Sequence, residues 1–280
     1  MNQQTGHQMV TADKDAAKNA EKMFRAEFKS EPATINAGTS ANLIFTIKDQ
    51  ANKSVQDLQI VHEKPMHLLV VSRDLAEFYH LHPEPLGDGS YAVAHVFPNG
   101  GEYRLYADFT LKDAAQVVEQ VDIKVSGAER AKVALQPDTK FEKNVGGLRV
   151  AMKTVGELKA GNELMLEFAA FDEKTNKPAT DLQNYLGELA HFVIISEDMK
   201  DFVHAHPMSK SKHNSMNKMV ADDHNDDGHT HGTEKTEIVK ASESEVAAHT
   251  AFPRSGLYKV WAQFQRGGQV ITVPYVISVS

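Results

Sequence analysis

The stretch HLLVVSRDLAEFYHLHP, residues 67–83, occurs a second time in the chain as HFVIISEDMKDFVHAHP, residues 191–207. Seven of the seventeen positions are identical, and three of these seven are histidines. Most apolar positions between them differ among similar residues (Leu to Phe, Val to Ile, Leu to Met), which is the pattern of a buried face kept after duplication. The chain therefore contains two copies of one unit, and the retained histidine pairs are His67/His191, His80/His204 and His82/His206.

The repeat extends over nearly the whole of each half. FPNGGEYRLYADF at 97–109 recurs as FPRSGLYKVWAQF at 252–264. Short apolar runs that alternate with period two and are separated by Gly, Pro, Asn and Asp are typical of an all-β sandwich or barrel. A Pro-x-x-Gly-x-Tyr turn before a strand is typical of the tyrosine corner of immunoglobulin-like domains. We therefore predict an all-β protein with two tandem immunoglobulin-like β-sandwich domains that arose from an internal duplication.

Composition predicts the domain boundaries. Polar residues without a sustained apolar face open the chain, and a charged segment without a clear period separates the two copies. We predict a flexible leader at 1–23, a first sandwich at 24–128, a linker at 129–145, and a second sandwich at 146–280 with a His-, Asp- and Met-rich insertion at 208–245.

The overall composition excludes several classes of protein. A formal net charge of −8 argues against a nucleic-acid or anionic-membrane partner, because both require a basic face. No apolar stretch approaches the roughly 18 residues of a transmembrane helix. The absence of cysteine excludes disulfides, thiolate catalysis and cysteine-type zinc sites.

The spacing of the histidines predicts a cluster. Residues two apart in a strand point to the same face, so His80 and His82 point together and their neighbours pack inward. A hairpin symmetric about Asp74-Leu75 places His67 opposite His82, where Cβ atoms are about 5 Å apart. The second copy has the same spacing. Because Asp-Leu is a poor two-residue turn, either the loop is longer or the register is shifted.

Three neutral imidazoles on rigid strands suit zinc or copper, and a thioether such as that of Met66 shifts the preference to copper(I). In the second copy, Ala190 replaces this methionine. His95 and His249 are further candidates, but they are one residue out of step before the Phe-Pro corner, which reverses the face of a strand. The predicted metal ligands are His67, His80, His82, His191, His204, His206, His95, His249 and Met66, and no catalytic residue is predicted.

Ordinary explanations compete with these predictions. Strand histidines are commonly surface or hydrogen-bonded residues, and the histidines of an insertion can belong to a solvated linker. The insertion nevertheless contains donors for a loose metal-collecting site, namely His213, His224, His229, His231, Met208, Met216 and Met219.

The segments MHLLVVSRDLAEFYHLHPE, FPNGGEYRLYADF and FPRSGLYKVWAQF resemble bacterial exported or lipid-anchored β-sandwich proteins related to the YtkA-like and CopC-like domains. The resemblance covers about residues 24–280. It implies the handling of copper or another heavy metal and an extracytoplasmic location. Ala190 departs from the Met-His pattern and places a methionine ligand of the second copy in doubt.

The sequence thus predicts a non-enzymatic metal-binding protein, with copper favoured over zinc, that acts as a carrier or buffer. We expect it at the cell surface as a lipoprotein, in the periplasm, or secreted. Its expected partners are a metal ion and a metal-transport protein or metalloenzyme, not nucleic acid.

Two alternatives remain. The first is an adhesive or assembly β-sandwich module with incidental histidines. The second is a cupin-like metalloenzyme, for which Glu84 has the wrong spacing and is replaced by Met208 in the second copy.

Overall fold

The computed structural model describes residues 23–112, 116–209 and 244–280, except for the side chains of residues 204 and 206–209. Nearly all of the predicted leader and residues 210–243 of the predicted insertion lie outside this description. Every element assigned in the described residues is a β-strand. These residues include no helix with the length and apolar character needed to cross a membrane.

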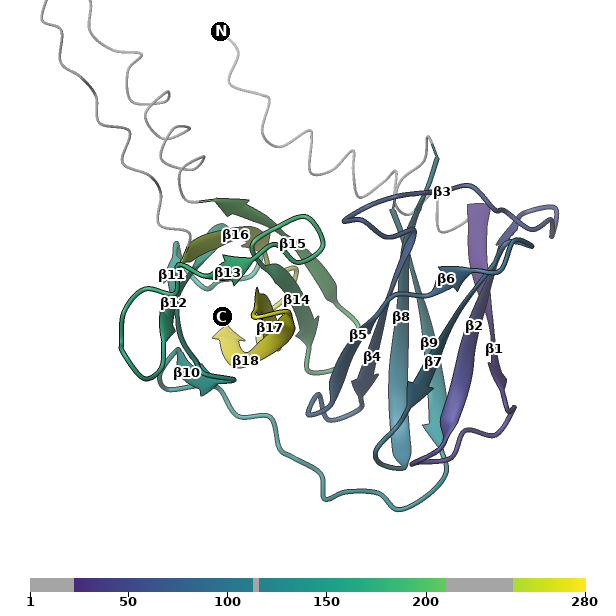
Figure 1. Cartoon of the computed structure of the whole chain (residues 1–280), viewed down its shortest axis with the longest axis horizontal. Helices are drawn as coiled ribbons and strands as arrows, with labels where there is room; N and C mark the ends of the chain where they lie inside the picture. Colours follow the sequence, from purple (N-terminus) through teal and green to yellow (C-terminus); the bar gives the residue numbers. More distant parts are fainter. Residues whose placement is uncertain (1–22, 113–115, 210–243) are drawn as a thin grey trace, which may run out of the picture. The chain divides into compact units, whose positions relative to one another are not determined.

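The chain divides into two compact units between Ala134 and Leu135, a position inside the range predicted as the linker. The last residues of that range are not a connection, because β10 (Glu142–Val145) pairs with β11 (Leu148–Val155) in the second unit. Each unit is an antiparallel β-sandwich with its own buried apolar cluster (Figure 1).

The first unit has two sheets. One sheet has the order β1 (Phe24–Glu31), β2 (Ser40–Asp49), β7 (Ser90–Val96), β6 (Glu84–Pro85). The other has the order β9 (Gln116–Val125), β8 (Gly101–Leu111), β4 (Met66–Ser72), β5 (Phe78–Leu81), with β3 (Leu58–Gln59) paired to the end of β8. This is the strand order of an immunoglobulin-like sandwich. The strand β5, which forms a hairpin with β4, extends the second sheet.

The second unit repeats this arrangement. Its strands are β11, β12 (Glu163–Asp172) and β16 (Glu245–Ala251) on one side, and β14 (His191–Ser196), β17 (Gly256–Arg266), β18 (Gln269–Val279) and the short β13 (Leu182–Gln183) on the other. The strand β15 (Phe202–Ser209) pairs first with β14 and then with β16, so it joins the two layers. In the first unit, two separate strands make the corresponding pairings: β5 pairs with β4, and β6 pairs with β7.

Alternation of apolar and polar residues forms the sandwich core. In β2, for example, Leu43, Phe45 and Ile47 are fully buried and face the opposite sheet. Burial of one such side chain contributes about 1.5 to 3 kcal/mol. The prediction of an all-β fold with two immunoglobulin-like sandwiches is confirmed.

The predicted tyrosine corners are present in both units. The hydroxyl of Tyr103 donates to the carbonyl oxygen of Asn99 at 3.0 Å, and that of Tyr258 donates to the carbonyl oxygen of Arg254 at 3.0 Å. Both tyrosines are buried, so each hydrogen bond fixes the turn that leads into β8 or β17.

The histidine hairpin has the predicted register. Leu69 pairs with His80 and Val71 with Phe78, as expected for a hairpin centred on Asp74-Leu75. Of the two alternatives, the longer loop is the one observed and the register is not shifted. Ser72 N donates to Glu77 O at 3.1 Å, and four residues lie between them. The second hairpin matches this register, with Ile195 paired to Phe202.

Candidate metal centre

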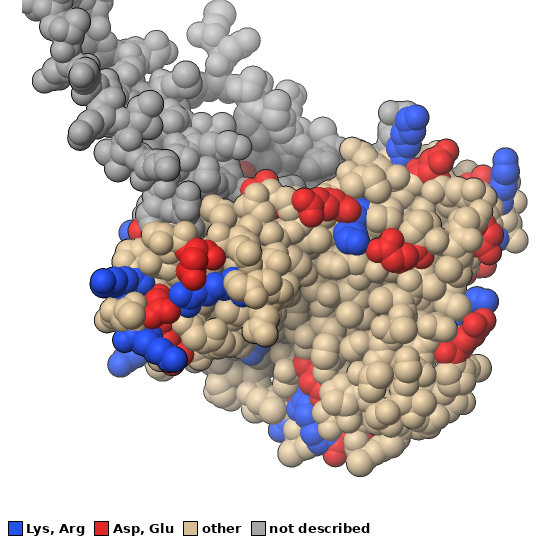
Figure 2. Space-filling view, in the orientation of Figure 1, with Lys and Arg blue, Asp and Glu red and all other residues tan. Residues whose placement is uncertain are grey.

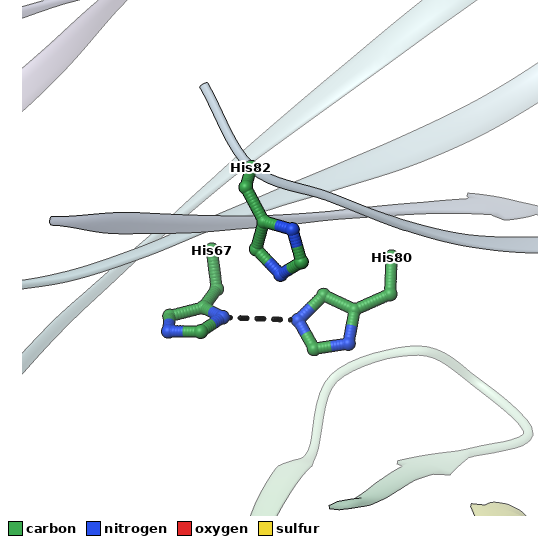
Figure 3. Close-up of side chains that lie close together, drawn as sticks. All are labelled: His67, His80 and His82. Atoms are coloured by element: carbon green, nitrogen blue, oxygen red, sulfur yellow. Dashed lines mark hydrogen bonds between the residues drawn. The ribbon is translucent and has the colours of Figure 1, made fainter. Parts of the chain in front are cut away.

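The hairpin of the first unit brings three predicted ligands together. His67 lies in β4, His80 lies in β5 and His82 follows β5 directly. Each offers a ring nitrogen, and these nitrogens all lie within 4.8 Å of one another. His67 Nδ1 and His80 Nε2 are 3.1 Å apart (Figure 3).

This geometry fits one metal ion held by three imidazoles. Zinc–nitrogen bonds of about 2.0 to 2.1 Å in a tetrahedral arrangement separate the ligand atoms by about 3.3 Å. The distance of 3.1 Å between His67 and His80 is close to that value. With a ring nitrogen of His82 within 4.8 Å of both, the three histidines would form a three-imidazole set, which leaves one coordination position open.

The backbone fixes the tautomer of His67. Its Nε2 hydrogen donates to the carbonyl oxygen of Val61 at 3.0 Å, so Nδ1 keeps its lone pair on the side of His80 and His82. Metal-bound histidines in proteins commonly donate their other ring hydrogen in this way. The carbonyl belongs to a tight turn that the sequence did not predict, in which His62 and Glu63 have φ of 47° and 64°.

The second unit has a related contact at His191. Its Nε2 lies 3.5 Å from the carbonyl oxygen of Leu186, which is also in a tight turn with positive φ. His191 is buried, like His67. The backbone of both units thus presents a carbonyl group to the first histidine of the repeated stretch.

Burial favours the neutral form of His67 and His82. It lowers the pKa of His82 to about 4, and the nearby positive charges of His67 and Lys64 act in the same direction. Burial also lowers the pKa of His67; the hydrogen bond to Val61 opposes this shift, and the charge of His62, whose ring centroid is 6.2 Å away, adds to it. Neutral imidazole is the metal-binding form, so His67 and His82 are in that form at neutral pH.

The sequence analysis did not single out His62. The duplication contains no signal for it, because Leu186 occupies the corresponding position of the second copy.

Two other retained positions shape the hairpin loop. Ser72 Oγ donates to Asp74 Oδ1 at 2.8 Å and accepts a hydrogen bond from Glu77 N at 2.9 Å. Ser196 Oγ makes the same two bonds, to Asp198 Oδ1 and from Asp201 N, at 2.7 and 2.9 Å. The identical serine and aspartate of the repeat are therefore explained by loop structure.

An arginine clamps each loop, but from a different place in the chain. In the first unit, Arg130 bonds to Asp74 and to Glu77, the latter at 2.6 Å. Burial acts to raise the pKa of Asp74, but the hydrogen bonds from Arg130, Ser72 and the backbone hold it well below its usual range. The clamp lines a polar pocket of about 260 Å³, whose lining includes none of the three histidines.

In the second unit, Arg254 of the corner turn makes the equivalent clamp. Its guanidinium bonds to Asp198 at 3.0 Å and to Asp201 at 2.7 Å. The position of Arg254 corresponds to Asn99 in the first unit, whose amide donates to Glu77 at 2.9 Å.

A buried carboxylate lies beside the cluster. Asp108 in β8 is the direct register partner of His67, and its residue is 7% exposed. The amide of Gln116 donates to both carboxylate oxygens, at 2.7 and 2.8 Å. Burial raises the pKa of Asp108 to about 6. The sequence analysis missed this residue, and comparison of the two copies contained no signal for it, since Gln263 replaces it in the second copy.

Two predicted ligands do not join the cluster. Met66 is fully buried in the sandwich core with Leu68 and Val70, because adjacent strand residues point to opposite faces. His95 also points inward, where its ring packs between Tyr79 and Phe97 at centroid distances of 4.6 and 4.5 Å. The inclusion of Met66 and His95 in one site with the three histidines was therefore wrong.

His249 faces the other way from His95, as the one-residue offset predicted. Its side chain is 48% exposed and its Nε2 lies 3.5 Å from Glu163 Oε2. In the backbone register, His249 is paired with His206 and Met165.

The rest of the second set is described in part. The backbone of His204 pairs with Val193, but the side chains of His204 and His206 lie outside the description. The same holds for the side chain of Met208 and for all of His213, Met216, Met219, His224, His229 and His231.

Comparison with models of protein families assigns the chain to one family. The model of a domain of unknown function (DUF8832) matches residues 20–127 and residues 143–280, one range in each unit. The chain belongs to the DUF8832 family. The two matched ranges agree with the internal duplication. Comparison with curated proteins found no match.

Solved structures similar to this DUF8832 chain include bacterial surface proteins. The Escherichia coli adhesin FdeC has 13% identity and a TM-score of 0.25, over 91% of this chain and 64% of the other. The Yersinia pseudotuberculosis adhesin InvE has 12% identity and a TM-score of 0.26, over 92% and 60%. The chain thus spans less than two thirds of these adhesin structures. Such TM-scores support no inference about function.

The charged residues of the described surface are mixed. In the view of Figure 2, Lys and Arg side chains lie interspersed with Asp and Glu, and the described residues on this face form no continuous basic patch. This distribution agrees with the net charge of −8 in giving no support to nucleic-acid binding.

Proposed function

We propose that this protein binds a copper or zinc ion through His67, His80 and His82, and acts outside the cytoplasm as a non-enzymatic metal carrier or buffer. The observation that supports this best is the orientation of His67. Its Nε2 is occupied by the carbonyl of Val61, and its Nδ1 faces the other two rings. His191, His204 and His206 are the corresponding set of the second unit.

The donor set suits exchange of the ion. Three neutral imidazoles leave a coordination position open, whereas purely structural zinc sites are closed by four protein ligands. An open position lets a partner protein supply a ligand and remove the ion. Because Met66 faces the core, the argument for copper(I) that relied on its thioether does not apply, and both zinc and copper remain suitable.

The test is a calorimetric titration of the intact chain with Zn²⁺ and Cu²⁺, compared with His80→Ala/His82→Ala. Loss of two of three ligands should remove one binding site per chain. His249→Ala, which changes an exposed histidine of the other unit, is the control for the first site. Unchanged stoichiometry and affinity in the double variant would refute the proposal.

The adhesive or assembly module is the alternative. The names of the solved neighbours include adhesins, but their TM-scores give those names no weight for this chain. A protein partner that binds equally well in the presence of a chelator and to His80→Ala/His82→Ala would favour this alternative. The cupin-like enzyme has less support, since Glu84 pairs with Lys64 at 3.0 Å on the surface.

A further inference from the structure

The position of Asp108 points to a role at the metal site. Asp108 and His67 are direct partners on neighbouring strands, so their Cβ atoms lie about 5 Å apart on the same face of the sheet. The next strand, β5, contains His80. Across the sheet, the carboxylate therefore adjoins the histidine cluster.

Its neighbour on β9 fixes the orientation of the carboxylate. The amide of Gln116 donates to both oxygens of Asp108, at 2.7 and 2.8 Å. With the residue only 7% exposed, water screens its charge weakly. A negative charge is thus held in place beside the cluster before any metal binds.

The second unit differs from the first in this charge. Gln263 is the direct partner of His191, is equally buried, and donates to Thr272 Oγ1 at 3.1 Å. A neutral amide therefore takes the place of the carboxylate. The same fold thus places a charge beside His67 and a dipole beside His191.

We propose that Asp108 is the charge partner of the metal in the first unit and makes this site select divalent ions over copper(I). The inference rests on the proposed function. Three neutral imidazoles leave the full charge of the ion uncompensated. The attraction of a fixed carboxylate is proportional to that charge, so it favours Zn²⁺ or Cu²⁺ twice as strongly as Cu⁺ in free energy.

The experiment uses the intact chain carrying His204→Ala/His206→Ala, so that binding reports on the first unit. Zn²⁺ and Cu⁺ affinities are measured by competition with chelators at about pH 8, where Asp108 with its pKa of about 6 is ionised. Asp108→Asn keeps the shape and an acceptor for Gln116. Glu102→Gln, an exposed residue of the same strand, controls for net charge.

Asp108→Asn should weaken Zn²⁺ binding by about tenfold or more and Cu⁺ binding by only about the square root of that factor. Glu102→Gln should change neither affinity by more than about twofold. Equal losses for the two ions, or no loss for Zn²⁺, would overturn the inference and leave the proposed function intact. A parent chain that binds neither ion would overturn both.

A reciprocal variant tests the idea independently of how Asp108→Asn folds. In the chain carrying His80→Ala/His82→Ala, Gln263→Glu should increase the preference of the second unit for Zn²⁺ over Cu⁺ by several-fold. An unchanged preference in this variant would count against a role for charge at this position.

Discussion

The ring of His82 is partly buried beside His67 and His80, and this burial makes the stability of the fold depend on pH. Because burial lowers its folded-state pKa to about 4, the unfolded chain binds more protons than the folded chain between about pH 6.5 and pH 4. The free energy of unfolding contributed by His82 is therefore fully present above about pH 6.5 and is lost as the pH falls towards 4.

We predict that His82→Gln removes this pH dependence. In the presence of a chelator, the unfolding free energy of the wild type minus that of the variant should be lower at about pH 4.5 than at about pH 7.5. The expected decrease is roughly 1 to 2 kcal/mol, after allowance for solvent screening of the ring. Urea titrations at the two pH values measure it. A difference that does not change with pH would contradict the lowered pKa.

A second group, Asp108, changes the stability in the opposite direction over the same acidic pH range. The pKa of Asp108 is raised by burial to about 6, so its contribution to stability is lost as the pH rises from about 4 to about 6. The total pH profile of the wild type is therefore a sum of opposite slopes. Comparing wild type with His82→Gln at each pH isolates the histidine.

At the residue scale, the clustering of His67, His80 and His82 could be predicted from the sequence, whereas Met66 was assigned to the wrong face of its strand. The rule that excludes it was available, since a residue next to His67 in a strand must point to the opposite face. Asp108 could be found only by asking which residue lies beside His67 on a different strand. That pairing depends on the register of β4 and β8, which are about 40 residues apart in the chain.

At the element scale, the hairpin depends on its loop, and the loop depends on an arginine. In the first unit, Arg130 reaches Asp74 and Glu77 from more than 50 residues away in the chain. These three side chains are between 11% and 25% exposed, so removal of the guanidinium leaves two shielded carboxylates without their cation. Unpaired charges of this kind are costly.

We predict that Arg130→Ala lowers the unfolding free energy by about 2 to 4 kcal/mol. Adding Asn99→Arg should restore at least half of the loss, because Arg254 clamps the second loop from the corresponding position. Arg25→Ala, which breaks an exposed pair with Glu27, should cost less than about 0.5 kcal/mol. If Asn99→Arg rescues nothing, the two clamps are not equivalent.

The register of this hairpin was predictable, whereas its clamp was not. A slip of one residue would place the Tyr79 and Leu81 side chains outside the core, so the apolar pattern fixes the pairing. The clamp has no such local signal. The two arginines occupy different positions in the repeat, so the comparison of the two copies conceals the feature that they share.

At the scale of the whole molecule, the duplication places one histidine hairpin in each of two units with separate apolar cores. An ion that binds only the folded state stabilises it by mass action, by about 2.7 kcal/mol at a concentration of 100 times the dissociation constant. Because each hairpin packs on its own core, each ion should stabilise mainly the unit that holds it.

Trp261 makes this separation measurable, since it is the single tryptophan of the chain and lies in β17 of the second unit. We predict that Zn²⁺ raises the unfolding temperature followed by Trp261 fluorescence by several degrees in wild type and in His80→Ala/His82→Ala. His204→Ala/His206→Ala should lose that shift, and a chelator should reverse it wherever it occurs. A shift that disappears in the first-hairpin variant would mean that the two units respond to metal as one cooperative body.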